Sequence, residues 1–185
     1  WHQCTGAEWT ARGYVLRRTG SFHLAAFDLE PAVTEARVVR RNCAPKTVVM
    51  KACLVTGAAA GIGRACCLRL ARQGFAVCVL DLNLEGCSRV VGEIEKAGGK
   101  AIALQASIAD RAQVVAAVND LRAAFGPVTV VVNNAGITRF VKFRDITDEA
   151  WDRMMEVNLK GTFIVTQVVL PDMEASQWGR IINIS

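Results

Sequence analysis

From residue 51 onward, apolar and polar positions follow two repeating patterns. Short and almost wholly apolar runs are typical of strands that are buried on both faces of a parallel sheet. Longer segments repeat apolar residues at helical spacing and end at glycine or at Gly-Pro. The expected strands are residues 51–55, 75–80, 101–104, 128–132 and 180–184, and the expected helices are residues 61–73, 84–97, 110–125 and 147–176.

The regular alternation of strand and helix predicts the fold class. It favours an α/β fold in which right-handed β-α-β crossovers build a Rossmann-type, doubly wound parallel sheet. The last expected helix, which carries Trp151, Phe163 and Met173, has an apolar surface that is too broad for one sheet face. This breadth suggests that the helix also meets a further surface.

Residues 1–49 differ from the rest of the chain because they show no sustained period of either kind. We interpret them as an irregular N-terminal extension, and residues 50–185 as the N-terminal portion of a domain. Another interpretation is that Met50 is the natural start and that the preceding residues are upstream sequence or an artefact. A targeting segment is disfavoured, because the four acidic residues do not suit a transit peptide and no apolar core suits a secretory signal.

Composition narrows the class of protein further. Hydrophobic residues make up 52% and charged residues 21%, which excludes a disordered chain, and no apolar run is long enough for a membrane span. The whole chain has a formal net charge of +5, but residues 50–185 hold 15 Lys+Arg against 13 Asp+Glu, and this near balance makes nucleic acid an unexpected partner. The seven cysteines form no Cys-x-x-Cys pair and have no nearby histidine, which predicts neither disulfides nor a metal site and favours a reducing, cytoplasmic setting.

Candidate chemistry begins at the turn between the first expected strand and the first helix. Residues 56–63 read Thr-Gly-Ala-Ala-Ala-Gly-Ile-Gly, and glycines in this place let the backbone approach a pyrophosphate at a helix N-terminus. Asp81 follows Gly63 by 18 residues and ends the second expected strand. This combination is typical of a dinucleotide site, whereas a plain glycine turn with a capping aspartate is the alternative.

Asp81 bears on the choice of cofactor. A carboxylate here can accept hydrogen bonds from the adenosine ribose and would repel a 2′-phosphate, which favours NAD(H) over NADP(H). Ala60 adds no cation inside the loop, although Arg64 on the first helical turn could reach a phosphate. NADP(H) is therefore not excluded.

Three motifs together resemble the short-chain dehydrogenases and reductases. The family pattern Thr-Gly-x-x-x-Gly-x-Gly matches residues 56–63, its Asn-Asn-Ala-Gly motif matches residues 133–136, and its helix asparagine matches Asn158. The resemblance covers residues 50–185. It implies a nicotinamide-dependent oxidoreductase that moves a hydride between the cofactor and a small-molecule carbonyl or secondary alcohol.

The resemblance also assigns site residues, with Asn158 as the active-site asparagine. In the family this residue acts through its backbone and a helix distortion to position a water; the alternative is a polar helix residue that caps a neighbour. Ser107 stands where many relatives have an aspartate at the adenine, and it and Ile108 could equally be ordinary strand-end residues. The implied cofactor-binding residues are Gly57, Ala60, Gly61, Ile62, Gly63, Asp81, Leu82, Ser107, Ile108, Asn134, Ala135 and Gly136.

Catalysis is where the chain departs from the family pattern. The family uses a serine and a tyrosine in Tyr-x-x-x-Lys, but the only tyrosine here is Tyr14, and Ser185 aligns one position before the expected serine. A phenol with a pKa lowered by a neighbouring lysine would make proton transfer feasible near neutral pH. We therefore expect a catalytically incomplete fragment, with the sheet incomplete at its C-terminal side.

Substrate and partners follow less directly. Residues 133–139, 148–152 and 178–180 look most like reductases of 3-oxoacyl thioesters, with sugar or small secondary-alcohol dehydrogenases as the alternative. A dinucleotide-binding module without turnover is a further alternative, and a nucleic-acid-binding arm in residues 1–49 is the least favoured one. The family resemblance implies a homodimer or homotetramer of the complete protein.

Overall fold

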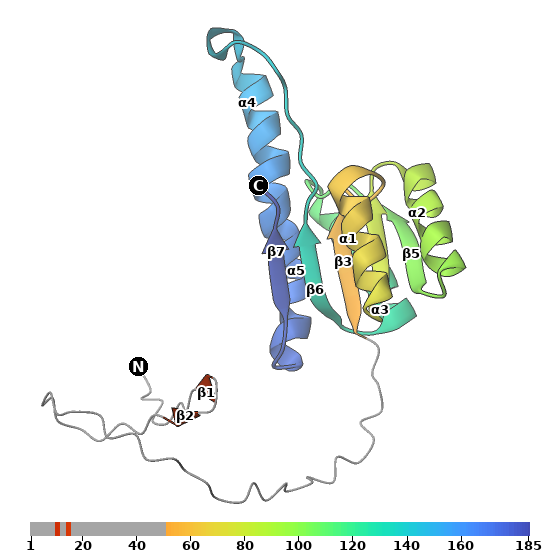
Figure 1. Cartoon of the computed structure of the whole chain (residues 1–185). Coiled ribbons are helices and arrows are strands. Elements are labelled where there is room, and N and C mark those ends of the chain that lie inside the picture. Colours follow the sequence, from red (N-terminus) through yellow and green to blue (C-terminus); the bar gives the residue numbers. More distant parts are fainter. Residues whose placement is uncertain (1–9, 12–13, 16–50) are drawn as a thin grey trace, which may run out of the picture. The chain divides into compact units, whose positions relative to one another are not determined.

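The computed structural model describes residues 10–11, 14–15 and 51–185 (Figure 1). Two short strands, β1 (Thr10–Ala11) and β2 (Tyr14–Val15), pair antiparallel with each other. The rest of the expected extension, and Met50 as its boundary, lie outside the described residues.

The domain of residues 51–185 is built on a five-stranded sheet whose strands all run parallel. The order β5-β4-β3-β6-β7 places β3 in the middle, so the chain moves outward to one edge and then returns to continue on the other side. The predicted parallel, doubly wound fold is confirmed, and each predicted strand is present within one residue of its expected bounds. The strands are β3 (Ala52–Thr56), β4 (Ala76–Asp81), β5 (Lys100–Gln105), β6 (Val128–Asn133) and β7 (Arg180–Asn183).

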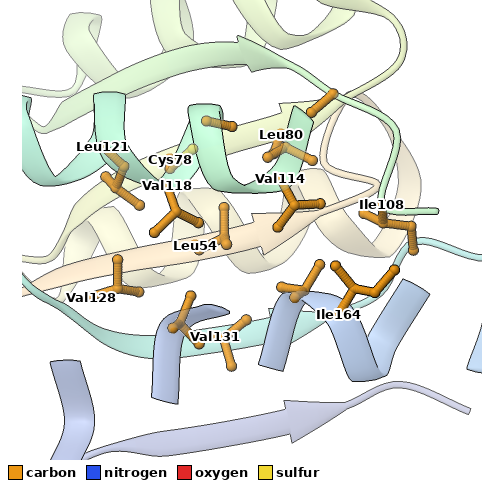
Figure 2. Packing of buried hydrophobic residues seen from close by; sticks show 14 of the residues in the cluster. Leu54, Cys78, Leu80, Ile108, Val114, Val118, Leu121, Val128, Val131 and Ile164 are labelled. Atoms are coloured by element: carbon orange, nitrogen blue, oxygen red, sulfur yellow. The ribbon is translucent and has the colours of Figure 1, made fainter. Parts of the chain in front are cut away.

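Helices cover both faces of the sheet, and alternate strand residues serve the two faces. On one face, Cys53 and Val55 of β3 pack with α1 (Gly61–Arg72) and α2 (Leu84–Lys96). On the other, Leu54 packs with α3 (Arg111–Phe125) and α5 (Thr162–Ala175) (Figure 2). Burial on both faces explains why the strands of this sheet are apolar at consecutive positions.

The helix expected over residues 147–176 is not one regular α-helix. It begins as α4 (Asp148–Met155), passes through the π-helical segment η2 (Glu156–Gly161) and continues as α5. The predicted long helix is confirmed over residues 148–175, and apolar spacing alone does not register the one-turn change in hydrogen bonding within it. This distortion lies at Asn158, where the family resemblance implied one.

The first half of this helix projects beyond the carboxyl ends of the strands (Figure 1). None of the α4 residues is buried, whereas α5 buries Ile164, Val165, Val169 and Met173 against the sheet. The expected excess of apolar surface is present, since five large side chains of this helix stay exposed. They are Trp151 at 53%, Met155 at 39%, Leu159 at 61%, Phe163 at 57% and Leu170 at 38%.

A partly buried ion pair joins α3 to α5 near the start of β6. The guanidinium of Arg122 donates to the carboxylate of Asp172, with 2.9 Å between Nε and Oδ2, and the same Oδ2 accepts the backbone N–H of Val128 at 2.9 Å. The pair therefore fixes both helices and the first residue of the strand. It lies at the end of the sheet opposite to the glycine turn.

Within the described residues, no helix is both long and apolar enough to cross a membrane. The same part of the chain holds no group of three His, Cys, Asp or Glu side chains placed to bind a metal ion.

Candidate functional site

The glycine turn leaves the carboxyl end of β3 and enters α1 in tight contact with the turn that follows β6. Gly57 has a φ of +63°, and a Cβ atom there would lie 2.8 Å from the Cα of Ala135. At Gly63 a Cβ would lie 2.2 Å from the carbonyl oxygen of Gly57. Both positions therefore require glycine, one for its backbone conformation and its close neighbour, the other for close approach alone.

Thr56 and Asn134 fasten these two turns together. The Thr56 hydroxyl accepts the backbone N–H groups of Asn134 and Ala135 at 3.1 and 3.0 Å. In return, the Asn134 side-chain amide donates to the carbonyl oxygens of Thr56 and Gly57, both at 3.0 Å. Asn134 therefore stabilises the glycine turn through its backbone carbonyl groups.

Asp81 ends the neighbouring strand β4 and is fixed by the backbone on both sides. Its Oδ2 accepts the backbone N–H of Ala59 in the glycine turn, and its Oδ1 accepts that of Asn83, each at 3.1 Å. The carboxylate thus has a defined orientation. Cys87 lies close by on α2, and burial, with the Asp81 charge as a smaller cause, raises the pKa of its thiol to about 11.

A cavity of about 250 Å³ opens where the strand order reverses, between the carboxyl ends of β3, β4, β5 and β6. Ligands of open α/β sheets bind at such a switch point. Seven of the predicted cofactor-binding residues line this cavity together. They are Gly57, Asp81, Leu82, Ser107, Ile108, Ala135 and Gly136.

The other predicted residues do not line the cavity. Ala60, Gly61 and the 60% exposed Ile62 form the end of the turn and the start of α1, while Gly63 is buried beneath them. The first backbone N–H groups of a helix have no intrahelical partner and can receive a phosphate. These residues are therefore placed for the part of a ligand that extends out of the cavity.

Asn158 lies in η2 and is bound to the chain just after the Asn-Asn-Ala-Gly motif. Its Oδ1 accepts the backbone N–H of Ile137 at 2.8 Å, and its Nδ2 donates to the carbonyl oxygen of Ile137 at 2.9 Å. The side chain thus holds the loop, and the backbone carbonyl oxygen of Asn158 accepts the Thr162 hydroxyl at 3.1 Å. Both bonds fit the alternative of a polar helix residue that caps a neighbouring segment, and the active-site role of Asn158 stays a prediction.

Five lining residues were not predicted. Leu80, Ala106 and Ile137 each adjoin a predicted residue in the sequence, so inspection of neighbours would have found them. Arg153 and Val157 come from the long helix and share a helix face at a spacing of four residues. Nothing in their own sequence context points to the cavity, because only the packing of this helix against the strand ends brings them there.

The parallel sheet with helices on both faces and a cavity at its switch point defines a Rossmann-type fold. The family model for short chain dehydrogenase matches residues 51–185, and the chain belongs to this family of enzymes. The family binds nicotinamide dinucleotides, and the glycine cradle and the cavity at the switch point fit such a group.

Relatives with curated names share a large part of the chain. It is 41% identical over 135 residues to the 3-oxoacyl-(acyl-carrier-protein) reductase of Thermotoga maritima, covering 73% of this chain and 55% of the relative. It is 46% identical over 130 residues to the peroxisomal hydratase-dehydrogenase-epimerase of Neurospora crassa, covering 70% of this chain and 14% of that protein. The chain thus spans about half the length of the reductases it matches.

Two solved structures match this chain in both fold and sequence. A 3-ketoacyl-ACP reductase from Sinorhizobium meliloti matches with a TM-score of 0.70 and 39% identity, covering 72% of this chain and 53% of the other. A metagenomic short-chain oxidoreductase in complex with NADP matches with a TM-score of 0.70 and 32% identity, covering 74% and 63%.

Proposed function

We propose that residues 51–185 bind NAD(H) within an oxidoreductase that moves a hydride between nicotinamide and a carbonyl or secondary alcohol. The observation that carries this proposal is the Asp81 carboxylate, held at 3.1 Å by two backbone N–H groups on the wall of a cavity at the switch point. A carboxylate held in this way is ready to accept the hydroxyl groups of an adenosine ribose. The dinucleotide, when bound, supplies the hydride acceptor or donor.

The preference for NAD(H) over NADP(H) rests on the charges around Asp81. Because two backbone bonds hold the carboxylate, it would have to give them up to rotate away from a 2′-phosphate. Arg64, a candidate cation on the first turn of α1, forms an ion pair with Glu93 on α2. Ala60 and Leu82, which flank the expected ribose position, carry no charge. The relative in complex with NADP supports NADP(H) as the alternative cofactor.

Each predicted residue receives a role under this proposal. The turn from Gly57 to Gly63 and the first turn of α1 would bind the pyrophosphate, and Asp81 and Leu82 would contact the adenosine. Ser107 and Ile108 would contact the adenine. Asn134 would keep the turn in place, Ala135 and Gly136 would border the cofactor ribose, and Asn158 would hold the loop at Ile137 while its helix distortion serves the reacting end.

A 3-oxoacyl thioester is the substrate we propose, because reductases of 3-oxoacyl-(acyl-carrier-protein) stand among the relatives. A sugar or a small secondary alcohol is the alternative substrate class. Residues 51–185 contain no tyrosine, so we further propose that the chain as given is catalytically incomplete. The same observation favours a second candidate function, a dinucleotide-binding module without turnover.

The exposed side chains of Trp151, Met155, Leu159 and Phe163 support a homodimer or homotetramer of the complete protein. The cytoplasmic location and the separation of residues 1–49 from the domain remain predictions from the sequence.

The proposed cofactor choice is tested with Asp81→Asn. The ratio of the NADPH and NADH dissociation constants should fall about tenfold, because the variant removes the charge that repels a 2′-phosphate. Titration of both dinucleotides with the wild-type chain, with Asp81→Asn and with Asp120→Ala, an exposed aspartate of α3 as control, measures this ratio. An unchanged ratio in Asp81→Asn, or tighter binding of NADPH to the wild type, would contradict the proposal.

A further inference from the structure

The cavity at the switch point has two charged residues in its lining, Asp81 and Arg153. Asp81 belongs to the motif that predicts a dinucleotide site, whereas Arg153 belongs to none of the motifs in this chain. Arg153 lies in α4, the first part of the long helix, and reaches the cavity lining from there. A cation in this wall calls for a role because the ligand proposed for the cavity carries phosphate groups.

Arg153 forms an ion pair with Glu156, the first residue of η2. Its Nη1 lies 2.9 Å from Oε2 of Glu156, and the two side chains are 55% and 40% exposed. The pair uses one nitrogen of a guanidinium that has five N–H donors. Arg153 therefore keeps donors for a ligand, while Glu156 cancels much of its net charge at a distance.

Arg153 also borders a second cavity, of about 480 Å³, which lies between α4 and the loop after β6. Ile137 and Arg153 are the residues common to both linings. Arg153 thus stands where the proposed dinucleotide cavity adjoins the cavity beside the loop.

We infer that Arg153 is a binding residue for the dinucleotide, whose phosphates its guanidinium attracts, and that Glu156 limits this attraction. The inference rests on the proposed function of the same cavity. The effect of Arg153 on the binding of phosphate groups is opposite in sign to that of Asp81, because Asp81 repels a phosphate and Arg153 attracts it. NADPH, which carries one more phosphate than NADH, should depend on Arg153 more strongly.

The test measures dissociation constants of NADH and NADPH by titration at low and at high salt, with the complete 185-residue chain. Arg153→Gln should weaken NADH binding about threefold to fivefold and NADPH binding about tenfold, as expected for an exposed charge contact. Glu156→Gln should strengthen both about twofold, since it leaves the guanidinium without its counter-charge. Both changes should shrink at high salt.

Arg89→Gln is the matched control. Arg89 forms an exposed ion pair with Glu85 on α2, with 2.7 Å between Nη1 and Oε1, and it is absent from the cavity lining. The Arg89→Gln substitution changes the net charge of the chain by the same amount as Arg153→Gln does. Thermal unfolding of each variant checks its fold, and if Arg153→Gln does not fold, Glu156→Gln carries the test alone.

The outcomes separate this inference from the proposed function. If the wild type binds a dinucleotide and Arg153→Gln binds it no more weakly than Arg89→Gln does, the inference is wrong and the proposed function stands. Weaker binding by Glu156→Gln would likewise overturn it. If the folded wild-type chain binds neither dinucleotide, the proposed function fails and the inference falls with it.

Discussion

The two neighbours of β6 in the sheet, β3 and β7, are both apolar strands but differ in how far they are buried. All five residues of β3 are buried, and Leu54 is 1% exposed. All four residues of β7 are exposed, with Ile181 at 42% and Ile182 at 43%. Both strands pair with β6 in parallel, so backbone pairing does not explain the difference.

Coverage explains it. β3 has a hydrogen-bonded strand on each side and helices on both faces, whereas β7 has one strand neighbour and packs near the end of α5. A run of apolar residues therefore predicts a strand but does not predict how deeply that strand is buried. The candidate site lies at the carboxyl end of the buried strand, where rigid neighbours can hold a turn in one conformation.

Gly63→Ala should have the largest effect on the buried region. The added Cβ would meet the carbonyl oxygen of Gly57 at 2.2 Å, and backbone cannot yield as a flexible side chain can. We expect about 3 kcal/mol or more of destabilisation and loss of measurable NADH binding. Urea unfolding and NADH titration measure the two effects.

Gly92→Ala is the control for this change, because a Cβ at this glycine of α2 meets nothing within 4 Å. It should raise the free energy of unfolding by up to about 1 kcal/mol through helix propensity. Equal stability of the two variants would show that the close approach at Gly63 is not essential.

Leu54→Ala and Ile182→Ala compare the two strands directly. Leu54→Ala should lower the free energy of unfolding by about 3 kcal/mol, because it leaves a cavity in a packed core. Ile182→Ala should cost less than about 1 kcal/mol, since the side chain is already 43% exposed. Urea unfolding of both variants measures these values, and a cost at Ile182 as large as that at Leu54 would show that β7 is covered in solution.

The thiols provide a test of the buried region by pH, because the described cysteines all belong to β3, β4, α1 and α2. Burial, followed by Cys66 and Cys87, raises the pKa of the Cys67 thiol from 9.0 to about 12. The folded state keeps this proton longer than the unfolded state does. The stabilisation is therefore complete below about pH 9 and is lost as the pH rises toward about 12, by about 1.4 kcal/mol per pH unit for this thiol.

Urea unfolding of the wild type and of Cys67→Ala across this pH range measures the effect. The variant should show a shallower loss of stability with pH. Parallel curves for the two proteins would exclude Cys67 as a source of the alkaline destabilisation.

The fold and the motif residues were predictable because their causes are local in the sequence. Apolar runs and helical spacing identified the strands and helices, and Asp81 was found because it ends a strand at a fixed distance from the glycine turn. The π-helical segment at Asn158 came from family resemblance and not from the apolar pattern. Arg153 escaped prediction because its place in the cavity wall depends on where a distant helix packs.

By itself, the sequence determined the order of the elements, the parallel sheet and the turn that needs glycine, since these follow from periodicity and from sterics between near neighbours. Only the tertiary structure decided that β3 is buried and β7 is exposed, that Asp81 is held by Ala59 and Asn83, and that Asp81 and Arg153 line one cavity. Burial and charge pairing depend on which surfaces meet in space, and residues far apart in the chain supply those surfaces.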